Sequence, residues 1–153
     1  MKVLIIYDSQ FGNTEKIAQA IAKNIPSAKL LQISKTNLED LNNVTLLIVG
    51  SPTQGGRATV PLQQFLDQIP AGKLTKVKVA VFDTRFGEKN VNFVLKIIIK
   101  TFNYAAPKIA EILEDKGGNL IVPPEGFIVT NKEGPLANNE LERAMVWAKK
   151  LQK

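Results

Sequence analysis

The chain has 153 residues, and its 20 lysines and arginines against 14 aspartates and glutamates give a formal net charge of +6. Its 44% hydrophobic and 22% charged content is typical of a soluble globular protein, and no apolar run reaches the roughly 18 residues of a membrane-spanning helix. The absence of cysteine and histidine excludes disulfides and cysteine nucleophiles, and it removes the usual metal ligand and general base. We therefore predict no catalytic side chain and no metal site, and expect a bound cofactor to supply any chemistry.

Short apolar runs alternate with helical patterns along the chain. The runs predict strands at 3–7, 30–33, 46–49, 77–82 and 120–122. The patterns predict helices at 14–25, 60–69, 105–116 and 139–151, and a helical turn or loop is expected at 37–43. This alternation predicts one α/β domain over 1–153, a three-layer, doubly wound, five-stranded parallel sheet. The first strand leaves no room for a signal peptide, so the cytoplasm is the expected location.

The most informative motif is Ser-Gln-Phe-Gly-Asn-Thr-Glu at 9–15, between the first predicted strand and the first predicted helix. Backbone N–H groups at a helix start have no intrahelical acceptor, and the helix dipole adds positive charge there, so the loop can receive a phosphate. The loop contains no lysine, which argues against a nucleotide-triphosphate P-loop, and it lacks a dinucleotide fingerprint. The other interpretation is an ordinary capped turn.

Three loops follow predicted strands, at 8–14, 50–57 and 83–87. Open parallel sheets bind ligands outside the carboxyl ends of their strands, where the winding reverses. The loops hold hydroxyls, glycines, arginines and aromatic rings. Each could be simple turn chemistry, but their convergence on one edge predicts a shared site.

The motif at 9–15, followed by Gly-Ser-Pro-Thr at 50–53, resembles flavodoxins and related FMN proteins over essentially the whole chain. Asp-Thr-Arg at 83–85 and Tyr-Ala-Ala-Pro at 104–107 resemble short flavodoxin-domain proteins. The resemblance implies a flavodoxin-like fold with FMN as the cofactor.

The same resemblance implies which loops hold the flavin. The first would wrap the phosphate, the second would flank the ribityl chain and one ring edge, and the third would flank the pyrimidine edge. The cofactor-binding residues implied are Ser9, Gln10, Phe11, Gly12, Asn13, Thr14, Pro52, Thr53, Gln54, Gly55, Gly56, Asp83, Thr84, Arg85 and Phe86.

Several features depart from the flavodoxin pattern. Phe11 stands where many flavodoxins have threonine, and the second loop has no aromatic residue to stack on the ring. Phe86 is the one aromatic residue in the third loop, and Trp147 is expected in the core. The chain is basic, whereas flavodoxins are usually acidic.

The leading interpretation is an FMN-binding protein that carries electrons between redox partners. The alternatives are an FMN-dependent quinone-type reductase and a flavin-free interaction module on a flavodoxin scaffold. The positive net charge favours an acidic redox partner. The sequence has no basic stripe with interleaved aromatic residues, so we do not expect nucleic-acid binding.

The segment 89–103 has an apolar face wider than a helix packed on one side requires. A well-buried helix is the favoured interpretation. A homodimer surface, peripheral contact with an anionic membrane and a docking face for a redox partner are the alternatives. The oligomeric state is left open.

Overall fold

The computed structural model describes residues 1–86 and 104–153, so the segment 89–103 and the hypotheses attached to it lie outside the described residues. The elements follow one another as β1 (Val3–Tyr7), α1 (Asn13–Lys23), β2 (Lys29–Gln32), β3 (Leu46–Pro52), α2 (Val60–Gln68), β4 (Lys78–Phe86), α4 (Ala105–Asp115), β5 (Asn119–Leu120), β6 (Glu125–Val129) and α5 (Glu140–Lys150). Two short 3-10 helices, Ile33–Lys35 and Leu38–Leu41, follow β2.

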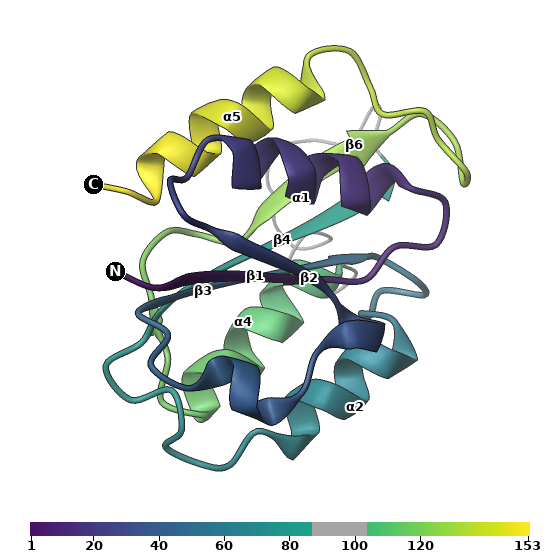
Figure 1. Cartoon of the computed structure of the whole chain (residues 1–153). Coiled ribbons are helices and arrows are strands. Elements are labelled where there is room, and N and C mark those ends of the chain that lie inside the picture. Colours follow the sequence, from purple (N-terminus) through teal and green to yellow (C-terminus); the bar gives the residue numbers. More distant parts are fainter. Residues whose placement is uncertain (87–103) are drawn as a thin grey trace.

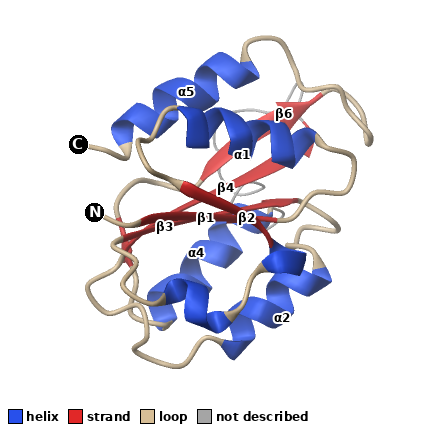
Figure 2. Ribbon diagram, viewed as in Figure 1, coloured by secondary structure: helices blue, strands red, loops and turns tan. Residues whose placement is uncertain are grey.

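The strands form one parallel sheet in the order β2-β1-β3-β4-β5, and β6 pairs with β4 further along the same edge. Helices α1 and α5 cover one face of this sheet, and α2 and α4 cover the other (Figures 1 and 2). The predicted doubly wound, three-layer architecture is confirmed. Among residues 1–86 and 104–153, no helix is long and apolar enough to cross a membrane.

β1 is buried on both faces, which is why its sequence is continuously apolar. In β1, Val3, Ile5 and Tyr7 belong to the core beneath α1 and α5. Leu4 and Ile6 belong to the opposite core, with α2 and α4. The strand that leads into the first loop is therefore fixed from both sides.

Three aromatic rings close the core on the α1 and α5 side. Phe82, Phe127 and Trp147 contact one another edge to face, with ring centroids 6.0–6.2 Å apart. Such pairs contribute about 0.5–1.5 kcal/mol each beyond their buried area. Trp147 is buried, which confirms its predicted place in the core.

Two predicted strand ends are wrong. The fourth strand was expected to end at residue 82, but β4 continues to Phe86, so 83–86 is a strand and not a loop. The fifth strand was expected at 120–122, but the edge next to β4 consists of two segments, β5 and β6. Pro123 and Pro124 separate them, because proline has no N–H to donate to a sheet ladder.

Candidate functional site

A cavity of about 440 Å³ lies at the carboxyl ends of the parallel strands, and its size is that of a small-molecule site. Its lining residues are Ser9, Gln10, Phe11, Asn13, Thr14, Pro52, Thr53, Gln54, Gly55, Thr84, Arg85, Phe86, Val129 and Lys132. The cavity thus joins all three segments predicted from the sequence. Gly12, Gly56 and Asp83 are the predicted residues that lie outside its lining.

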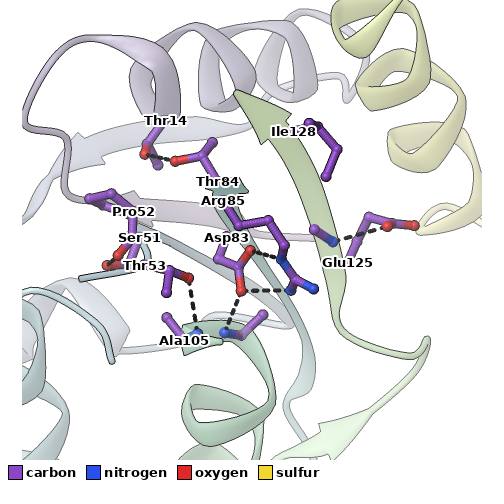
Figure 3. A network of polar contacts seen from close by, with 12 residues as sticks. Thr14, Ser51, Pro52, Thr53, Asp83, Thr84, Arg85, Ala105, Glu125 and Ile128 are labelled. Atoms are coloured by element: carbon purple, nitrogen blue, oxygen red, sulfur yellow. Dashed lines mark hydrogen bonds and ion pairs between the residues drawn. The ribbon is translucent and has the colours of Figure 1, made fainter. Parts of the chain in front are cut away.

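The first loop is shaped by the Ser9 hydroxyl. Its Oγ accepts hydrogen bonds from the N–H groups of Gly12, at 3.1 Å, and Glu15, at 3.3 Å. Gly12 turns the chain into α1 with φ +91°, a left-handed conformation that favours glycine. The Thr14 hydroxyl is hydrogen-bonded to that of Thr84, with 2.8 Å between the oxygens (Figure 3), which ties the helix start to β4.

Four backbone N–H groups at this helix start have no acceptor within the described residues. They belong to Gln10, Phe11, Asn13 and Thr14, all of which line the cavity. Asn13 and Thr14 are buried, and a buried donor without an acceptor costs about 1–3 kcal/mol. Donors in this arrangement, at the positive end of a helix dipole, fit an anion.

The second loop is a tight turn whose outer residues, Gln54 and Arg57, pair backbone to backbone. Gly55 and Gly56 occupy the turn with φ of +57° and +79°. The Gln54 amide nitrogen donates to the side-chain oxygen of Gln10 at 2.5 Å, which links the second loop to the first. The Gly56 carbonyl instead accepts a hydrogen bond from the Lys108 ammonium group at 2.6 Å, away from the cavity.

Asp83 and Arg85 form a buried ion pair at the end of β4 (Figure 3). Arg85 Nε and Nη2 donate to the two carboxylate oxygens of Asp83 at 2.6 and 2.7 Å. The guanidinium carbon also lies 3.8 Å from the centroid of the Tyr104 ring. The charge of Arg85 at the cavity wall is therefore neutralised by its partner.

Asp83 also fixes the start of α4. Its Oδ2 accepts a hydrogen bond from the N–H of Ala106 at 2.8 Å, and Thr53 Oγ1 accepts one from Ala105 (Figure 3). Burial raises the pKa of the Asp83 carboxyl above its ordinary value, against the hydrogen bonds from Arg85 and Ala106, which lower it. The Asp83 carboxylate thus contacts Arg85 and the start of α4, and its predicted place beside the flavin stays a prediction.

Two large aromatic side chains of the cavity lining are exposed. Phe11 is 41% exposed and Phe86 is 50% exposed. Exposed rings at a cavity offer surface for stacking on a flat ligand. Arg57, at the end of the second loop, does not line this cavity but lies at a smaller one of about 250 Å³ between α2 and α4.

Val129 and Lys132 line the cavity and were not predicted. They lie at the carboxyl end of β6 and in the loop that follows it. The strand-end rule that identified the other loops also applies to this one, but the predicted end of the fifth strand was misplaced. A correct assignment of β6 would have identified them.

The family model for flavodoxins matches residues 5–147. The chain belongs to the flavodoxin family. Proteins of this family bind FMN. The strand order and the cavity at the reversal of the winding agree with this assignment.

Curated relatives match parts of this chain. A flavodoxin from Aquifex aeolicus is 34% identical over 73 residues, which is 44% of this chain and 40% of the relative. One from Clostridium beijerinckii is 33% identical over 84 residues, 51% of this chain and 60% of the relative. An NAD(P)H dehydrogenase (quinone) from Cupriavidus metallidurans is 29% identical over 91 residues, 44% of this chain and 46% of the relative. The matches thus span less than two thirds of each relative.

Solved structures share the fold over the whole chain. Oxidised flavodoxin 2 from Bacillus cereus superposes with a TM-score of 0.74 at 23% identity, covering 99% of this chain and 98% of the other. A flavodoxin from the domain Archaea superposes with a TM-score of 0.73 at 21% identity, covering 100% of both chains.

The residues present fit FMN. Its phosphate is an anion of the kind that the unpaired N–H groups of the first loop can receive. Its flat ring matches the two exposed aromatic side chains, Phe11 and Phe86. The first loop would hold the phosphate, and Gln54 and Gly55 would border the ring.

We predict that Asp83→Asn lowers the free energy of unfolding by about 3 kcal/mol, because it leaves the buried Arg85 charge without its ionic partner. Urea denaturation at pH 7 measures this loss. Asp67→Asn, at an exposed acid of α2, is the matched control and should change stability little. Adding Arg85→Gln to Asp83→Asn should restore part of the loss. Equal, small effects of Asp83→Asn and Asp67→Asn would contradict the pairing.

Proposed function

We propose that this chain carries electrons between redox proteins through a noncovalently bound FMN. The observation that carries the proposal is the set of four N–H groups without an acceptor in the described residues, at the start of α1 and on the cavity wall. When bound, FMN supplies the electron-transfer chemistry. The role of the protein is to hold, orient and partly cover it.

The contacts between loops support a preformed site. The Thr14 side chain is hydrogen-bonded to that of Thr84, and the Gln10 side chain to that of Gln54. The first loop is therefore tied to β4 and to the second loop. A site that is already ordered loses less conformational entropy when its ligand binds. These ties favour a cofactor site over the alternative of a flavin-free interaction module.

We propose an acidic protein as the redox partner. The net charge of +6 would attract such a partner over a long range and speed the encounter. The exposed Phe86 at the cavity offers an apolar contact close to the flavin ring. Because salt screens the attraction, the rate of electron transfer should fall as ionic strength rises.

We predict that Gly12→Ala weakens FMN binding by about 5–30-fold. A side chain at φ +91° costs about 1–2 kcal/mol, and the loop would shift its N–H groups to relieve that strain. Flavin titration followed by its visible absorbance and fluorescence measures the affinity. Gly72→Ala is the control, because Gly72 also has positive φ, +79°, and lies away from the cavity. Equal FMN affinity in the two variants would contradict the assigned role of the first loop.

A second prediction separates a carrier from a quinone reductase. The FMN-loaded protein should not turn over with NADPH and a quinone alone, but should pass electrons when an NADPH-oxidising flavoprotein and a haem-protein acceptor are added. NADPH brings further phosphates, whereas the described cavity lining offers only Lys132 as a cation outside an ion pair. Absorbance at the acceptor measures the rate. Turnover with NADPH and quinone alone would identify the reductase.

A further inference from the structure

A closed hairpin, residues 129–136, connects β6 to α5 beside the cavity. Val129 and Leu136 pair as an antiparallel bridge at its base. The N–H and the hydroxyl of Thr130 both donate to the carbonyl of Pro135 at 2.9 Å. The hairpin is therefore held in one shape by its own polar groups.

The 129–136 hairpin is attached to the start of α1. The Asn13 side-chain amide donates to the carbonyl of Glu133 at 3.1 Å. Gly134 packs against the same amide so closely that a Cβ there would lie 2.6 Å from Asn13 Oδ1. The unpaired N–H groups of Gln10, Phe11, Asn13 and Thr14 form the proposed phosphate seat. Because Asn13 contacts the hairpin, the hairpin lies beside this seat, at the same end of the molecule as the start of α1 (Figure 1).

The hairpin brings a lysine to the cavity wall. The lining contains two cations, Arg85 and Lys132, and Arg85 is paired with Asp83. Lys132 forms no ion pair with residues 1–86 or 104–153. The loop at 8–14 has no basic residue of its own and begins with Asp8. The proposed phosphate seat thus has a free positive charge only on the hairpin, as far as the described chain goes.

We propose that the 129–136 hairpin is the outer wall of the phosphate seat and that Lys132 makes the site select phosphorylated flavin over riboflavin. The inference rests on the proposed FMN function and adds to it a residue outside the three loops that the sequence identified. A lysine ammonium is a compact charge that reaches a phosphate as a point charge, whereas N–H groups fix the phosphate geometry. The two contributions are complementary.

Lys132→Gln tests this proposal. Its affinity for FMN at low ionic strength should fall about fivefold, and that of Lys132→Glu should fall further, because the charge changes from attractive to repulsive. Its affinity for riboflavin, which has no phosphate, should not change. The FMN affinity of Lys132→Gln should also depend less on salt than that of the parent protein. Titration of each flavin against each variant, followed by fluorescence, supplies all of these values.

Lys149→Gln is the matched control, because it removes the same charge from an exposed lysine in the last turn of α5, at the far end from the hairpin (Figure 1). It should leave both affinities unchanged. If the parent protein binds FMN and Lys132→Gln binds it equally well, the role of Lys132 is overturned while FMN binding stands. If the parent protein binds no FMN, the proposed function is overturned together with this inference.

Discussion

The binding site is organised around the backbone N–H groups at the start of α1, which have no acceptor in the described chain. Two of the four residues, Asn13 and Thr14, are buried, and a buried donor without an acceptor costs about 1–3 kcal/mol. Three neighbouring segments nevertheless hold the helix start in this position, through Thr84, Gln54 and Glu133. A bound phosphate would satisfy the donors and offset this cost, so cofactor binding and stability of the loop are coupled.

The charges around the cavity are arranged unevenly. At the end formed by β4, Arg85 is neutralised by Asp83, so the wall there carries little net charge. At the start of α1, the helix dipole, the N–H groups and Lys132 all favour an anion. A ligand with an anionic tail and a flat, largely neutral ring would therefore bind in one orientation, with the tail at α1.

The sequence predicted those parts of the fold in which local pattern and tertiary environment agree. Val3–Tyr7 is apolar throughout and forms β1 with the predicted bounds. The polar residues Asp83 and Arg85 predict a loop, because the contacts that bury them in a strand come from the ring of Tyr104 and the start of α4, about twenty residues later. Pro123 and Pro124 interrupt the strand pattern, so β6 was not predicted, and neither was the loop after it that carries Lys132. Both errors arose where distant segments decide the local structure.

The central claim is that N–H groups of the first loop receive the FMN phosphate, and amide NMR of the ¹⁵N-labelled protein tests it most directly. On addition of FMN, the proton resonances of Gln10, Phe11, Asn13 and Thr14 should move downfield, as expected for N–H groups that gain a charged acceptor. Riboflavin should leave those resonances nearly unmoved while shifting residues near the ring. FMN binding that leaves these four resonances unchanged, or moves them no more than riboflavin does, would contradict the claim.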